Sequence, residues 1–163
     1  MVAVNSTMLE LGTEAPSFEL PDPAGALVAL EAVADGNPVL VAFVCNHCPY
    51  VRHIGPTFGR VADQLASMGV ATVGVNSNDI EHYPEDAPEA MAVTAERWGW
   101  RFPYLLDEEQ TVAKAYRAAC TPDLFLFDAD LRLAYRGQFD SSRPRNDLPI
   151  DGADIRMAAR AVV

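Results

Sequence analysis

The chain has 163 residues, half of them hydrophobic, and this length is sufficient for one domain with a full hydrophobic core. The composition excludes a disordered chain and a collagen-like repeat. The chain has 23 acidic and 12 basic side chains, which gives a formal net charge of −11. Because a surface this acidic repels phosphate backbones and anionic headgroups, we expect neither nucleic acid nor membrane as a partner.

The N-terminal segment predicts a β-hairpin. Apolar and polar side chains alternate over residues 15–20, and the turn-forming sequence Pro-Asp-Pro-Ala-Gly follows at 21–25. Residues 26–30 then supply the return strand. We therefore expect a short hairpin ahead of the main sheet.

Residues 38–44 and the segment after them predict a buried strand followed by a helix. The first run is continuously apolar, as in a strand covered on both faces. Apolar residues then recur every three or four positions from Tyr50 to Met68, which is the period of a helix. Pro56 interrupts this pattern and predicts a kink, and Gly69 is the expected C-cap.

The second half of the chain alternates strands and helices. Residues 70–75 predict a second buried strand, and an acidic loop from Asp79 to Glu89 predicts a solvated face. The remaining expected elements are a helix over 89–98, a strand at 103–106, a helix over 112–119, a hairpin formed by 123–127 and 131–137, and a helix at 153–163. This order predicts a single domain over residues 1–163, a mixed α/β sheet with helices on both faces.

Targeting signals and cysteine content indicate a cytoplasmic location. The stretch Met1–Leu20 has neither the basic start nor the apolar core of a secretion signal. No run reaches the roughly 18 apolar residues of a membrane-spanning helix. Three cysteines are too few for a disulfide-stapled secreted scaffold.

Cys45 and Cys48 form a C-x-x-C pair between the predicted central strand and the helix. In a cytosolic protein this spacing indicates redox chemistry or metal binding. A helix N-terminus stabilises a thiolate through its free N–H groups and its dipole. We therefore expect Cys45 to carry the more exposed sulfur, with a lowered pKa, and to attack a substrate, while Cys48 resolves the mixed disulfide.

The two residues between the cysteines are the candidates for tuning the reduction potential. They are Asn46 and His47. A partly positive imidazole at position 47 stabilises a neighbouring thiolate, which makes the disulfide a stronger oxidant.

A second candidate segment is Cys120-Thr121-Pro122, directly before a predicted strand. A proline that leads a strand after threonine is a place where a cis peptide can present backbone to a bound thiol. Thr121 and Pro122 are therefore the predicted substrate-binding residues. Cys120 is either a small buried side chain or a third redox cysteine.

These features together resemble the thioredoxin fold, and the resemblance is closest to its redoxin (AhpC/TSA-like) branch with a Cys-Asn-His-Cys motif. That branch holds peroxiredoxins and thioredoxin-like reductases. The resemblance covers about residues 9–140, and the segments that carry it are 11–22, 43–51, 76–86 and 120–128. It implies that Cys45 attacks, that Cys48 resolves and that Pro122 is a cis-proline.

One departure from the family pattern affects proton transfer. Thioredoxins carry a buried acid on the strand before the active site, whereas residues 39–44 contain no carboxylate. Proton transfer from Cys48 must then use water, His47 or an acid from elsewhere. Similar proteins often extend further, so we also allow for a truncated C-terminus after Val163.

The function predicted from these observations is thiol–disulfide exchange without a cofactor. The expected partners are a protein or low-molecular-weight disulfide or thiol, and a thiol reductant or reductase. A peroxidase is the first alternative, because Pro38 matches the P-x-x-x-T-x-x-C motif of peroxiredoxins, although Ala42 replaces its threonine and Arg143 is the only arginine we could assign to peroxide. A metal-binding module, with nitrogen from His47 or His53, is the second.

Overall fold

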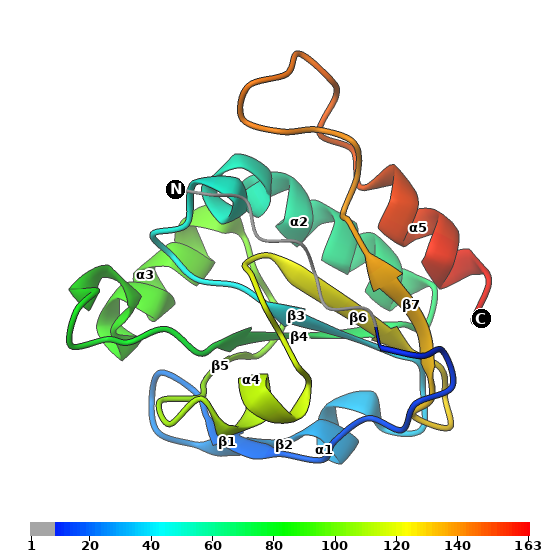
Figure 1. Cartoon of the computed structure of the whole chain (residues 1–163), viewed down its shortest axis with the longest axis horizontal. Helices are drawn as coiled ribbons and strands as arrows, with labels where there is room; N and C mark the ends of the chain where they lie inside the picture. Colours follow the sequence, from blue (N-terminus) through cyan, green and yellow to red (C-terminus); the bar gives the residue numbers. More distant parts are fainter. Residues whose placement is uncertain (1–8) are drawn as a thin grey trace.

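A five-stranded mixed sheet forms the centre of the computed structural model, which describes residues 9–163 (Figure 1). The strand order is β5-β4-β3-β6-β7. Central strand β3 pairs in parallel with β4 and antiparallel with β6. The strands are β3 (Val39–Phe43), β4 (Ala71–Asn76), β5 (Tyr104–Leu106), β6 (Asp123–Phe127) and β7 (Leu133–Gly137). The predicted mixed α/β architecture is confirmed.

Helices cover both faces of this sheet (Figure 1). One face packs against α2 (Pro49–Ser67), α3 (Pro88–Trp98) and α5 (Ala153–Arg160), and the other against α1 (Leu30–Ala34) and α4 (Thr111–Ala115). In β3, Leu40 and Ala42 face the first cluster, whereas Val41 and Phe43 face the second. Because both faces are buried, the strand carries no polar position.

The N-terminal hairpin is present as β1 (Glu19–Pro21) paired antiparallel with β2 (Leu27–Ala29). The expected return strand ends one residue early, because Leu30 begins the five-residue helix α1 and is fully buried. A helix this short shows no periodic pattern, which is why the sequence did not predict it. Part of the stretch examined for a secretion signal, residues 1–8, lies outside the described residues.

Helix α2 runs from Pro49, at its first position, to Ser67 and continues through Pro56. Cys48 is its N-cap, and Gly69 follows the C-cap with φ of +84°. The helix therefore starts directly after the second cysteine. In the part of the chain that the structure describes, no helix is long and apolar enough to cross a membrane.

Two glycines of α2 allow the end of α3 to approach closely. The Trp98 ring lies against Gly55, and the backbone carbonyl oxygen of Trp98 lies over Gly59. The Trp100 indole N–H donates a hydrogen bond of 2.8 Å to the carbonyl oxygen of Gly55. The helix that carries the second cysteine is thus held along its length by the tryptophan segment.

The remaining predictions differ from the structure mainly at element ends. Helix α4 stops at Ala115, so the predicted extension to Ala119 is wrong; Arg117, at φ of +51°, already lies in the left-handed region. The hairpin of β6 and β7 is confirmed. A short 3-10 helix at Pro84–Asp86 interrupts the acidic loop, and no pattern in the sequence predicted it.

Candidate active site

Both cysteines of the C-x-x-C pair are reduced and buried. Cys45 is 1% exposed and Cys48 is 4% exposed. The expectation that Cys45 carries the more exposed sulfur is therefore wrong. Its Sγ lies 3.5 Å from the hydroxyl of Thr121, and within 4.8 Å of side-chain atoms of His47, in the same loop, and of Asp86.

The two thiols shift one another's pKa in opposite directions. A hydrogen bond to Cys48, together with burial, raises the pKa of Cys45 well above its ordinary value. The same hydrogen bond, aided by Thr121 and by backbone N–H groups of Val51 and Tyr50, lowers the pKa of Cys48 to about 5. We expected a lowered pKa at Cys45, but the hydrogen bond to Cys48 and burial act in the opposite direction there.

The loop before β6 reaches both sulfurs. The Thr121–Pro122 peptide bond is cis, as predicted. The Cys48 thiol lies 3.2 Å from the carbonyl oxygen of Thr121. The Cys120 Sγ lies 3.7 Å from the carbonyl oxygen of Pro122, and burial raises its pKa to about 11.

Asp86 is a central residue of the site that the sequence did not predict. It lies in the loop expected to be a solvated face, yet it is fully buried. Its Oδ1 accepts hydrogen bonds from the backbone N–H groups of Asn46 (2.6 Å) and His47 (3.2 Å). Its Oδ2 accepts from the Asn78 amide (2.7 Å), and the Asn76 amide holds its backbone carbonyl (2.9 Å).

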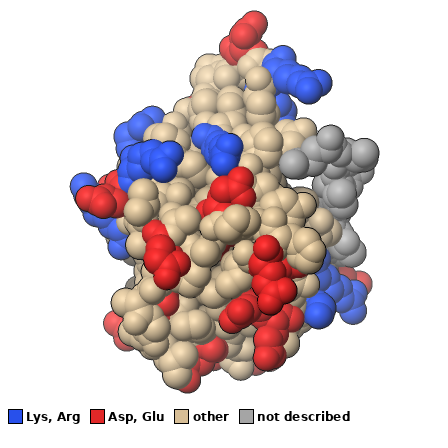
Figure 2. Space-filling model, turned by 90° about the vertical axis from the view of Figure 1, so that its left-hand side faces the viewer, with Lys and Arg blue, Asp and Glu red and all other residues tan. Residues whose placement is uncertain are grey.

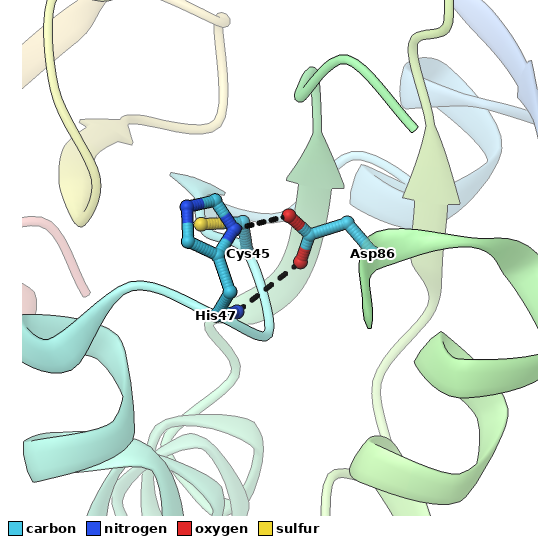
Figure 3. A group of neighbouring side chains, drawn as sticks. All are labelled: Cys45, His47 and Asp86. Atoms are coloured by element: carbon cyan, nitrogen blue, oxygen red, sulfur yellow. Dashed lines mark hydrogen bonds and ion pairs between the residues drawn. The ribbon is translucent and has the colours of Figure 1, made fainter. Parts of the chain in front are cut away.

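The imidazole of His47 is fixed on two sides. Its Nδ1 lies 2.5 Å from Oδ2 of Asp86, and its ring stacks on Tyr83 with centroids 4.3 Å apart and the planes nearly parallel. A ring nitrogen of His47, an Asp86 oxygen and the Cys45 sulfur lie within 4.8 Å of one another (Figure 3). The structure thus brings the predicted residue His47 to Cys45.

Asn46 joins the C-x-x-C loop to its neighbours. Its amide donates 2.7 Å to the carbonyl oxygen of Glu85, and its side-chain oxygen accepts 3.0 Å from the hydroxyl of Tyr104. Its own carbonyl accepts from Nε of Arg52 at 2.8 Å. The predicted tuning residue therefore holds the loop in position through its hydrogen bonds.

The donor set around Cys45, His47 and Asp86 does not favour a metal ion. The Asn78 amide donates a hydrogen bond of 2.7 Å to Oδ2 of Asp86, so it directs a hydrogen at an atom that a metal would need. His53, the other histidine considered, hydrogen-bonds Ser142 instead, at 3.3 Å. These contacts fit a hydrogen-bonded carboxylate better than a ligand set.

A groove of about 740 Å³ opens beside the C-x-x-C loop, between α2 and α3. Asn46 lies at its cysteine end, and charged and apolar side chains alternate along it; its other lining residues are Arg52, Glu85, Glu89, Ala90, Val93, Thr94, Arg97 and Trp98. Figure 2 shows the face of the molecule that lies to the left in Figure 1, with many acidic side chains in its lower half.

The residues considered for peroxide binding do not assemble at the cysteines. Ala42 is a fully buried strand residue and offers no hydroxyl. The guanidinium of Arg143 is used within its own loop, where it donates to the carbonyl oxygens of Asp140 (2.8 Å) and Ser142 (2.6 Å) and to the side chain of Gln138 (2.5 Å). The peroxiredoxin pattern is therefore incomplete around Cys45.

Comparison with protein families gives a match to the AhpC/TSA family over residues 11–136. The chain belongs to the AhpC/TSA family. None of the curated proteins compared with it matches. Its resemblance to the redoxin branch, stated above from short segments, is thereby confirmed for most of the chain.

Solved structures similar to this AhpC/TSA-family protein share its thioredoxin-like fold. An uncharacterized conserved protein from Geobacillus kaustophilus is 50% identical with a TM-score of 0.95, over 99% of this chain and 86% of that one. A peroxidoxin from Mycobacterium tuberculosis (20%, TM-score 0.73) and a thiol:disulfide interchange protein from Chlorobium tepidum (20%, TM-score 0.70) each cover 96% of this chain and 99% of their own. The thioredoxin fold is confirmed.

Proposed function

We propose that this protein is a thiol–disulfide oxidoreductase whose Cys45–Cys48 dithiol reduces or forms disulfides. The observation that carries the proposal is a pair of free cysteines at the start of α2 whose sulfurs both contact Thr121 of the cis Thr121–Pro122 peptide. A dithiol that can cycle through a disulfide is the chemical requirement of such exchange.

The reducing direction proceeds in two balanced steps. The Cys45 sulfur forms a bond to one sulfur of a substrate disulfide, the substrate S–S bond breaks, and the leaving sulfur takes a proton. The Cys48 thiolate then attacks the Cys45 sulfur and releases the second substrate thiol. Cys48 loses its own proton before this attack, and the second substrate sulfur takes a proton as it leaves, so the dithiol loses two electrons and two protons and the substrate gains both. An external thiol reductant or reductase restores the dithiol by the reverse exchange.

The substrate class we propose is a protein or low-molecular-weight disulfide, and the location we propose is the cytoplasm. The chemistry needs no cofactor, since both electrons come from the dithiol. Thr121 supports substrate binding in this proposal, because its hydroxyl and carbonyl oxygen lie at the two sulfurs.

The test is a trapping experiment with Cys48→Ser, which removes the resolving thiol. We expect the variant to accumulate a mixed disulfide on Cys45 that dithiothreitol releases, whereas the matched control Cys120→Ser accumulates none. In glutathione buffers of graded potential, the wild-type protein is expected to form a reversible Cys45–Cys48 disulfide, mapped by alkylation and mass. Absence of both products refutes the proposal.

The same variants separate exchange from peroxidase chemistry. If peroxide oxidises Cys45 to a sulfenate at a catalytic rate while model disulfides do not react, the peroxidase alternative replaces the proposal. We expect slow oxidation, because Ala42 provides no hydroxyl and Arg143 is engaged in its loop.

A further inference from the structure

The reduced pair leaves Cys45 with a proton to lose. The Cys45 sulfur is buried, 3.5 Å from the hydroxyl of Thr121 and within 4.8 Å of His47 and Asp86 side-chain atoms. A thiol attacks a disulfide only as its thiolate. If Cys45 forms the first bond, as the proposed function requires, a base must accept its proton, and the central strand carries no carboxylate for that task.

The hydrogen bonds of Asp86 determine which nitrogen of His47 carries a proton. Three donors surround the carboxylate: the backbone N–H groups of Asn46 and His47, and the Asn78 amide nitrogen, which can only donate. A carboxylate surrounded in this way accepts from His47 as well, so Nδ1 carries the hydrogen of the 2.5 Å contact. In this tautomer the lone pair is on Nε2, which has no protein hydrogen-bond partner within residues 9–163.

We propose that His47 is the base that takes the proton of Cys45, and that Asp86 is the positioning residue that fixes its tautomer and ring orientation. The imidazole, the carboxylate and the Cys45 sulfur lie within 4.8 Å of one another (Figure 3). Stacking on Tyr83 holds the ring plane. The proton moves from Sγ to the ring, and the sulfur electron pair forms the bond to the substrate sulfur.

Few other charged groups face this pair. Tyr83 stacks on the ring, and Tyr104 stays neutral because burial raises its pKa well above the ordinary value. Arg52 bonds a backbone oxygen of the loop, and Glu85 contacts Asn46 through its carbonyl oxygen while its side chain is exposed. Cys48 is the remaining ionisable group, and replacing it in the test removes its contribution.

The experiment measures alkylation of Cys45 by iodoacetamide against pH, in a Cys48→Ser, Cys120→Ser protein where one thiol remains. His47→Gln removes the base. A general base accelerates a reaction by about 10²–10⁴-fold, and a small reagent gains less than this, so we expect alkylation at pH 7 to slow at least tenfold. Asp86→Asn is expected to slow it similarly. The introduced amide presents N–H to Nδ1, so the ring proton moves to Nε2 and the lone pair is lost.

Two further measurements separate positioning from a structural role. Nitrogen NMR of the His47 ring is expected to show the Nδ1–H tautomer in the parent and the Nε2–H tautomer in Asp86→Asn. In the His47→Gln, Asp86→Asn double variant, we expect alkylation to be no slower than in His47→Gln alone. The matched control is Asp140→Asn, another buried carboxylate bonded to backbone N–H groups, for which we expect the alkylation profile to be unchanged.

The outcomes are distinct. If Asp86 acts only through its charge, Asp86→Asn speeds alkylation because a negative charge near the sulfur is removed, and the proposal is overturned. An unchanged pH profile in His47→Gln also overturns it, whether or not Asp86→Asn folds. Failure of Cys48→Ser to trap a mixed disulfide contradicts the exchange function instead, and leaves the alkylation result to decide the role of His47.

Discussion

Gly59 lies where α2 packs on the end of α3, and replacing it with alanine tests how closely the two helices must approach. A Cβ at this position lies 2.6 Å from the carbonyl oxygen of Trp98 and 3.0 Å from that of Gly99, against 3.4–4 Å for ordinary contacts. The obstructing atoms belong to the backbone that ends α3. The helices must therefore separate by at least 0.8 Å at this point.

The magnitude follows from two opposing terms. Alanine is better than glycine in a helix by about 1 kcal/mol. Overpacking costs about 1–3 kcal/mol, and a backbone obstacle places this site at the upper end. We therefore expect Gly59→Ala to lower the free energy of unfolding by about 2 kcal/mol.

Urea unfolding followed by circular dichroism measures this change. Gln64→Ala, an exposed position on the same helix, is the control, and we expect it to stay within about 0.5 kcal/mol of the wild type. A Gly59→Ala protein as stable as the wild type, or more stable, refutes the argument that the glycine is required by the close approach of the α3 end.

Two further predictions concern the dithiol and its loop. The pKa of Cys48 is lowered in the folded protein to about 5, so the stabilisation from its thiolate is present above pH 9 and is lost as the pH falls towards 5. Between pH 9 and pH 5, we expect the urea midpoint of the reduced wild-type protein to decrease by more than that of Cys48→Ser. An equal dependence of the midpoint on pH in the two proteins contradicts this prediction. Tyr104→Phe removes the donor to the buried oxygen of Asn46 and is expected to cost about 1–3 kcal/mol in urea unfolding, with no change if water replaces the hydroxyl.

Much of the fold was predictable because its strands are covered on both faces. The uninterrupted apolar run of β3 predicted a central strand, and the residues after it predicted a helix that starts at the cysteine pair. Element ends depended on tertiary contacts instead. Helix α1 is too short to show a period, and α4 ends at Ala115 where the chain turns, which no local pattern marks.

The site was predicted in its cysteines and in the Thr121–Pro122 loop, but not in its carboxylate. Local sequence describes Asp86 as one of several acids in a polar loop. Its burial depends on long-range hydrogen bonds to the backbone at Asn46 and to the side chains of Asn76 and Asn78. The one available signal was the resemblance of segment 76–86 to the redoxin branch, which named the segment without a role for this residue.

The packing of α2 also has an optical consequence. The chain contains two tryptophans, Trp98 and Trp100, with ring centroids 5.1 Å apart, and both touch α2 at Gly55. Trp98 also lines the groove beside the C-x-x-C loop. All indole fluorescence of the protein therefore originates at the junction between the cysteine-bearing helix and its neighbour. A change in emission on oxidation or on ligand addition reports the docking of that single helix, without any introduced label.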